Sequence, residues 1–155
     1  MGNIRVEGKK LIYQRKDELT IIEPYGMNCL RCRSTKNSKI LDENWTVLPP
    51  ATADDCHIEC DGRFATITNG AMKATIDAGQ IWYGGIITYF KKDTPVLHTR
   101  FEGDYSNRNQ HIEGDHYKIS VIFDANEGEH FYGIGQEQVD LFDRKGSTSQ
   151  IIHYN

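Results

Sequence analysis

Long apolar runs are missing from this sequence, and so is an apolar segment near its start. The longest apolar stretches, around Ile81-Trp82-Tyr83 and Ile86-Ile87, fall far below the roughly 18 residues that a transmembrane helix needs. The first ten residues, MGNIRVEGKK, carry charges where a signal peptide has its apolar core. We therefore expect a soluble protein located in the cytoplasm.

An excess of positive charge is also missing. The 155 residues include 18 Lys and Arg against 22 Asp and Glu, which gives a net charge of −4. Nucleic acids and anionic membranes are bound by clustered positive charge that neutralises phosphates. We therefore expect neither a nucleic acid nor a membrane as a partner.

Helical periodicity is absent as well, and short apolar segments alternate with polar residues instead. Turn residues interrupt these segments about every 8–12 residues, which is typical of an antiparallel sandwich or barrel. The pattern is clearest over residues 56–101, where Asp61-Gly62 and Asn69-Gly70 separate alternating segments. Such dipeptides favour type I′ hairpin turns because they accept positive φ at both central positions. The pattern predicts a five-strand meander.

The flanking segments extend the β pattern. We expect a hairpin over residues 10–23, a strand over 28–34, and loops over 42–53 and 102–115. Further downstream, the alternation predicts one strand in which four apolar residues share a face: Tyr117, Ile119, Val121 and Phe123. The fold class that follows is all-β.

The four cysteines raise the question of a metal site. The spacings Cys29-x-x-Cys32 and Cys56-x-x-x-Cys60 superficially match a four-thiolate zinc site. Residues three apart in a strand point to opposite faces, however, so Cys29 and Cys32 are poorly placed to bind one ion. Cys56 and Cys60 share a face with Ile58, which indicates core. We therefore favour buried thiols over zinc and expect no metal.

No other cluster predicts a cofactor or an active site. Residues 111–116 bring histidines and carboxylates together, and we interpret them as a solvated loop rather than a metal site. Gly133-Ile134-Gly135 lacks the third glycine and the βαβ unit of a dinucleotide site. Composition and spacing alone therefore describe a soluble β-sandwich without a visible active site.

The C-terminal third carries motifs that resemble a known family. Residues 129–137 read Glu-His-Phe-Tyr-Gly-Ile-Gly-Gln-Glu, residues 141–146 Leu-Phe-Asp-Arg-Lys-Gly, and residues 152–155 Ile-His-Tyr-Asn. This order resembles glycoside hydrolase family 31, the retaining α-glucosidases and α-xylosidases, in which an aromatic-rich strand, a Lys/Arg-Gly turn and a strand ending in Trp/Tyr-Asn follow one another. Residues 23–34 and 40–49 resemble the family's early strand and the segment after it.

The resemblance implies an antiparallel β-sandwich of the galactose-mutarotase-like (supersandwich) type. It would occupy residues 1–155 as the N-terminal domain, with later strands missing. In the family, two aspartates of a following (β/α)₈ barrel catalyse hydrolysis through a covalent glycosyl-enzyme, and such a barrel alone needs about 250 residues. We therefore expect no catalytic residue in this chain, no cofactor, and no activity of the chain alone.

The resemblance also implies which residues approach the substrate. In the family, a loop after the Trp/Tyr-Asn position contacts sugar hydroxyls, and Asn155 matches the start of that loop. His153, Gln136 and Glu137 lie near the same approach. The competing interpretation is that Gln136 and Glu137 only satisfy backbone groups of a turn. Gln136 stands where many family members carry Glu, which leaves the substrate branch open.

Two functions stay open at this point. The first is a non-catalytic domain that packs on its own catalytic barrel and helps to shape the entrance for an α-linked sugar. The second is a free-standing carbohydrate-binding β-sandwich. A sugar epimerase is disfavoured because no His and Glu pair for acid–base chemistry can be identified. Exposed sheet edges also predict self-association.

Overall fold

The computed structural model describes most of the chain as strands and turns. It covers residues 2–15, 18–44, 47–48, 55–79, 85–100, 109–114, 116–133 and 141–148. The chain divides into two compact units, residues 1–124 and residues 125–155. None of the described residues forms a helix that could cross a membrane.

The first sheet is an antiparallel meander of four strands in the order β1-β2-β3-β4. Its strands are β1 (Asn3–Glu7), β2 (Lys10–Arg15), β3 (Glu18–Pro24) and β4 (Leu30–Thr35). The hairpin predicted over residues 10–23 is confirmed by β2 and β3, and the strand predicted over 28–34 by β4.

The second sheet has the order β12-β9-β8-β7-β6-β5. Its strands are β5 (Cys56–Cys60), β6 (Phe64–Asn69), β7 (Met72–Asp77), β8 (Ile86–Lys91), β9 (Thr94–Arg100) and β12 (Ile122–Phe123). The predicted five-strand meander is therefore confirmed, and β12 adds a short strand beside β9. All the pairings in both sheets are antiparallel.

The two glycine turns of the second sheet form where predicted, but not as type I′ turns. Only the glycine has a positive φ in each, +90° at Gly62 and +57° at Gly70. Asn69 stays in β6, paired with Met72, and its side chain is only 2% exposed. Asp61 accepts hydrogen bonds from the backbone N–H groups of Arg63 and Phe64 through Oδ1. The Asp61 side chain is therefore held by local hydrogen bonds, whereas the Asn69 side chain donates to the carbonyls of Gly26 and Cys29 in the turn between β3 and β4.

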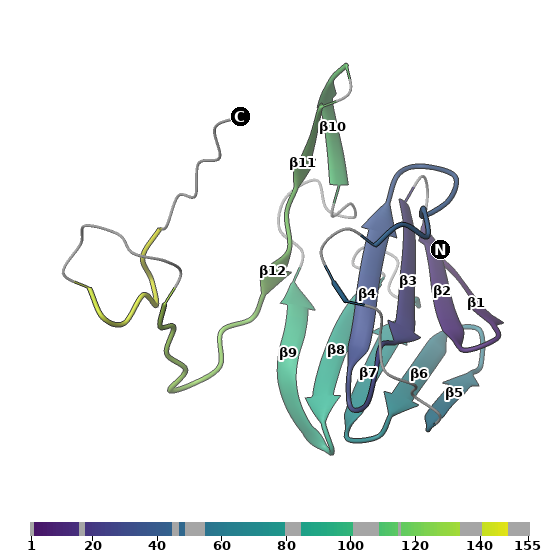
Figure 1. Ribbon diagram of the computed structural model, residues 1–155, viewed down its shortest axis with the longest axis horizontal. Coiled ribbons are helices and arrows are strands. Elements are labelled where there is room, and N and C mark those ends of the chain that lie inside the picture. The colour runs from purple at the N-terminus through teal and green to yellow at the C-terminus, as the bar shows by residue number, and fades with distance from the viewer. Residues whose placement is uncertain are drawn as a thin grey trace. The chain divides into compact units, whose positions relative to one another are not determined.

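The main core lies between the two sheets, which face each other in Figure 1. Leu11 and Ile22 of the first sheet pack in one cluster with Ile67, Ile76 and Ile87 of the second, and each is at most 1% exposed. Successive side chains of a strand point to opposite faces, so the alternating apolar residues of both sheets meet in this layer. The described residues form an antiparallel β-sandwich, as predicted.

The outer face of the first sheet carries a small second core and a charged cluster. Ile12, Leu19 and Ile21 form the apolar cluster, against which Ile40 packs. Beside it, Glu23 pairs with Arg31 and Arg33 at 2.8 and 2.7 Å, and its side chain is only 7% exposed. The segment after β4 therefore covers part of this face.

Two expectations for residues 102–123 are wrong. Residues 109–113 form strand β10 (Asn109–Glu113), which pairs with β11 (His116–Ile119), so the predicted loop contains a hairpin. The single strand predicted over Tyr117–Phe123 is split into β11 and β12, which pair with different strands. Ile119, Val121 and Phe123 are 70%, 51% and 42% exposed. Their alternation therefore does not mark a buried face.

The expectation of buried thiols is also wrong. Cys29, Cys32 and Cys60 are exposed, and only Cys56 is partly buried, where it packs against the main core with Ile58. The reason is position in the sheet, because Cys32 lies on β4 and Cys60 on β5, and both are edge strands. A side chain on an edge strand is covered from one side only.

Candidate functional site

The substrate-approach residues implied by the family resemblance lie outside the described residues. These are Asn155, His153, Gln136 and Glu137. Their assignment stays a prediction. Among the residues that the structure does describe, no group of three or more His, Cys, Asp or Glu side chains is placed to hold a metal ion.

A groove crosses the outer face of the second sheet. Its main hollow has a volume of about 500 Å³ and is lined by residues of four adjacent strands: Phe64, Ala65, Thr66, Thr75, Ile76, Asp77, Ile86, Thr88 and His98. Ala65 and Ile76 belong to the core face, and the remaining side chains point to the opposite face because the strands alternate. A volume in this range is typical of small-molecule sites.

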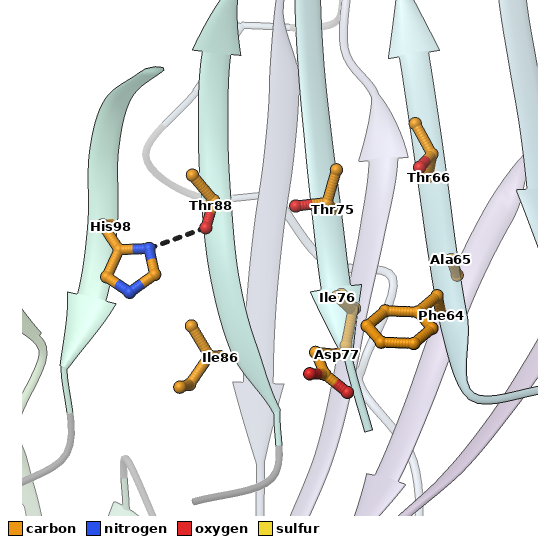
Figure 2. Close-up of a pocket in the computed structure, with 9 residues that line it drawn as sticks. All are labelled: Phe64, Ala65, Thr66, Thr75, Ile76, Asp77, Ile86, Thr88 and His98. Carbon is orange, nitrogen blue, oxygen red and sulfur yellow. Dashed lines mark hydrogen bonds between the residues drawn. The ribbon is translucent and has the colours of Figure 1, made fainter. Parts of the chain in front are cut away.

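The register of the sheet arranges these residues in two rows. Thr66 pairs with Thr75, Thr75 with Thr88, and Thr88 with His98. The second row runs from Phe64 through Asp77 to Ile86. Figure 2 shows the two rows side by side. One row therefore offers hydroxyl groups and an imidazole, and the other an aromatic ring, a carboxylate and an alkyl group.

The groove retains hydrogen-bonding capacity that the sheet does not use. The hydroxyls of Thr66 and Thr75 make no hydrogen bond to any residue within the described ranges. Thr88 Oγ1 lies 2.7 Å from His98 Nδ1, and this contact closes one end of the row. Asp77 accepts the backbone N–H of Gly79 with Oδ1 at 2.8 Å, which leaves its second oxygen for other partners. Each threonine hydroxyl is one donor and two acceptors.

Phe64 stands between two hollows. The second hollow, of about 310 Å³, shares Phe64, Ala65 and Thr66 with the first and continues to Glu59, Cys60 and Asp61. The Phe64 side chain is 48% exposed, and the Arg63 guanidinium lies 5.0 Å from the centre of its ring. Arg63 Nε also lies 3.9 Å from Asp77 Oδ1. The ring therefore contacts a neighbouring cation and is still accessible.

The family motif at residues 129–133 belongs to the second unit. Phe131 donates its backbone N–H to Asp143 Oδ1 at 3.1 Å, and His130 Nδ1 lies 2.6 Å from Asp143 Oδ2. The backbone N–H of Arg144 donates to the Phe131 carbonyl at 2.7 Å. These contacts join residues 129–133 to residues 141–147. The described part of the motif forms no strand, unlike the strand that the resemblance implies.

Residues 129–133 and 141–147 form a loop pair, and Asp143 is its electrostatic centre. The hydrogen bond from the His130 side chain, followed by the backbone N–H groups of Lys145 and Phe131, lowers the pKa of Asp143 to about 2. The Tyr132 ring stacks on the His130 ring, with 6.0 Å between centroids, and lies 4.9 Å from the Phe142 ring. Phe142 is 85% exposed. The carboxylate therefore organises a loop pair that displays aromatic side chains.

Sequence reasoning missed the groove, although one signal was present. Threonine occupies an outward position in each of three consecutive strands, at Thr66, Thr75 and Thr88. If the register of the hairpins had been known, it would have predicted that these three side chains lie in one row across the sheet. The register was not available from the sequence because it depends on the turn that each hairpin adopts.

Comparison with known proteins places these features in context. No family model matches the sequence. The chain is 25% identical over 156 aligned residues to a protein from Pseudescherichia vulneris described as an uncharacterized family 31 glucosidase, ORF2. That alignment covers 86% of this chain and 28% of the relative.

The fold is similar to a solved structure, the crystal structure of a GH31 α-xylosidase from a soil metagenome complexed with xylose. The TM-score is 0.75 at 20% identity, and the match covers 93% of this chain and 24% of that one. The chain thus spans about a quarter of the length of the proteins it matches. The structural match supports the β-sandwich fold, and the sequence match confirms the resemblance of this chain to glycoside hydrolase family 31.

Proposed function

We propose that this chain serves as the non-catalytic β-sandwich domain of a longer retaining α-glycoside hydrolase. One observation carries the proposal. The chain matches family 31 proteins over 86% and 93% of its own length but over only 28% and 24% of theirs. The described residues form the core of a β-sandwich. The reaction then belongs to residues that this chain does not contain.

In this proposal, residues 1–155 act as one domain that packs on the catalytic barrel and helps to shape the entrance for an α-linked glucoside or xyloside. The residues that would face the sugar are Asn155, His153, Gln136 and Glu137, as the family resemblance implies. The aromatic loop pair around Asp143 supports a packing role, because exposed apolar side chains on a surface often mark an interaction site.

The test compares the purified chain with the longer protein that contains it. Hydrolysis of p-nitrophenyl α-glucoside and p-nitrophenyl α-xyloside is followed for both. We expect turnover by the longer protein and none by the chain alone. Turnover by the 155-residue chain would overturn the proposal. Replacement of Asn155 by Ala in the longer protein should raise KM, and an unchanged KM would remove this residue from the substrate entrance.

We also propose that the isolated chain self-associates through an exposed sheet edge. The edge strands are β1 and β4 in the first sheet and β5 and β12 in the second. Unpaired backbone groups on an edge favour pairing with another chain. Sedimentation at high concentration should show a dimer or larger species, and a single monomer would contradict this.

A further inference from the structure

We propose that the groove on the outer face of the second sheet binds a neutral oligosaccharide, with Phe64 between two sugar rings. The groove contains none of the residues assigned to the substrate entrance. The choice of a sugar as the ligand class rests on the proposed function. The existence of the groove does not depend on the proposed function, because it follows from the positions of the lining residues.

The shape of the groove favours an extended ligand over a single small molecule. Two hollows of about 500 and 310 Å³ meet at Phe64, Ala65 and Thr66. A ligand that occupies both must pass over the Phe64 ring. An oligosaccharide meets this requirement because its rings are separated by glycosidic bonds and present an apolar face to an aromatic side chain.

The polar groups of the groove match sugar hydroxyls. The Thr66 and Thr75 hydroxyls and one Asp77 oxygen have no hydrogen-bond partner among the described residues, and each sugar hydroxyl both donates and accepts. Few well-placed polar groups on a largely apolar lining are typical of ligand sites. Because all of these groups project from paired strands, they are held in place before a ligand arrives.

The charges around the groove favour a neutral ligand. Asp77 lines the first hollow, and Glu59 and Asp61 line the second. Arg63 lies beside Phe64 and close to Asp77, so its charge is partly balanced. An anionic ligand would meet a carboxylate in each of the two hollows, which disfavours acidic sugars and phosphates.

The experiment is an NMR titration of the full 155-residue chain with maltotriose, xylotriose and, as an anionic comparison, tri-galacturonic acid. We expect maltotriose or xylotriose to shift the amide signals of Phe64, Thr66, Thr75 and Asp77, and tri-galacturonic acid to bind more weakly. Absence of shifts in the groove with both neutral sugars would overturn the inference, as would equal or tighter binding of the anionic sugar.

Matched variants test the placement of the ligand. Phe64→Ala should weaken binding by about tenfold or more, which corresponds to about 1.4 kcal/mol. Phe142→Ala removes an exposed ring of the second unit that lines neither hollow and should leave binding unchanged. Thr75→Val should weaken binding about threefold to tenfold by removing one hydroxyl. Thr68→Val, on the same face but outside both hollows, should not.

The comparison of Thr75→Val with Thr68→Val tests the proposed site even if Phe64→Ala does not fold, because valine keeps the shape and strand preference of threonine. Binding that is unaffected by Thr75→Val, or equally affected by Thr68→Val, would place the sugar elsewhere and overturn the inference. The turnover assay is independent of this result. If the groove does not bind sugar, the proposed non-catalytic role is unaffected. If the chain alone turns over substrate, that role is overturned, but the binding results for the groove remain valid.

Discussion

Asn28 and Asn69 each hydrogen-bond the turn that carries the other. Asn69, at the end of β6, donates from Nδ2 to the carbonyl oxygens of Gly26 and Cys29 at 2.8 and 2.7 Å. Asn28, in the turn between β3 and β4, accepts the backbone N–H of Ala71 at 2.6 Å. Two side chains thus join the β3–β4 turn of the first sheet to the β6–β7 turn of the second.

Replacement of Asn69 by Ala should destabilise the fold by about 2–3 kcal/mol. The variant loses two hydrogen bonds made by a residue that is only 2% exposed, and the Gly26 carbonyl loses this donor. The Cys29 carbonyl keeps the backbone N–H of Tyr25. Urea unfolding followed by far-UV circular dichroism measures the change. Asn37→Ala, in the exposed turn after β4, serves as the control and should shift stability by less than about 0.5 kcal/mol. Equal effects of the two substitutions would contradict the role of Asn69.

Replacement of Glu23 by Ala should cost about 3 kcal/mol of stability. The substitution removes the carboxylate that Arg31 and Arg33 share at 2.8 and 2.7 Å, and both guanidinium side chains are only 18% exposed. Removing one partner of a buried ion pair is strongly unfavourable because the remaining buried charge is no longer compensated. Glu7→Ala is the matched control. Its carboxylate pairs with Arg5 at 2.8 Å but is 60% exposed, so the cost should stay below about 1 kcal/mol.

Asp143 should titrate at about pH 2, well below the ordinary pKa of an aspartate, 3.8. The pKa is lower in the folded than in the unfolded chain, so the contribution of this carboxylate to the loop pair is fully present above about pH 4. It is lost as the pH falls from about 4 towards 2. Carbon-13 NMR of the carboxyl groups follows the titration directly.

The hydrogen bond from His130 is the largest cause of the low pKa of Asp143. His130→Ala should therefore move the titration of Asp143 upward, towards 3.8. His57→Ala removes a second exposed imidazole, which lies 3.2 Å from Glu59, and should leave Asp143 unchanged. If Asp143 titrates near 3.8 in the unmodified chain, the proposed contact between residues 130 and 143 is absent in solution.

The four cysteines should react with iodoacetamide at two different rates. Cys29, Cys32 and Cys60 are exposed, whereas burial raises the pKa of Cys56, an effect that the positive charge of Lys9 only partly offsets. The thiolate is the reactive form, so Cys56 should be alkylated severalfold more slowly at pH 8. Mass spectrometry of tryptic peptides measures each rate. In urea all four rates should become similar, and a fast Cys56 in the folded chain would refute its partial burial.

Much of the strand pattern was predictable because the outward and inward residues of the hairpins alternate in the sequence. Ile67 and Ile76, for example, are the inward residues of β6 and β7, and both are at most 1% exposed. β10 was not predictable in the same way. Its sequence Asn-Gln-His-Ile-Glu shows no apolar alternation, and pairing with β11 creates the strand. Strand formation depends on the partner as much as on intrinsic preference.

Exposure was harder to predict than strand position. The alternation of Ile119, Val121 and Phe123 defines a face but says nothing about whether another layer covers it, and here all three are exposed. Cys32 and Cys60 follow the same rule, since the sequence does not reveal that their strands lie at sheet edges. The groove depends on a third unknown, the register, which alone brings Thr66, Thr75 and Thr88 into one row.

The order of the strands makes the molecule divisible. The first sheet is complete before residue 36, the second begins at Cys56, and no described strand of one pairs with a strand of the other. The sheets are joined by side chains, namely the apolar cluster between them and the interlocked asparagines. Cleavage of the backbone between Leu48 and Cys56 would leave the strand pairings within each sheet intact. The chain is therefore suited to fragment complementation, in which two separately made pieces recover the fold by docking.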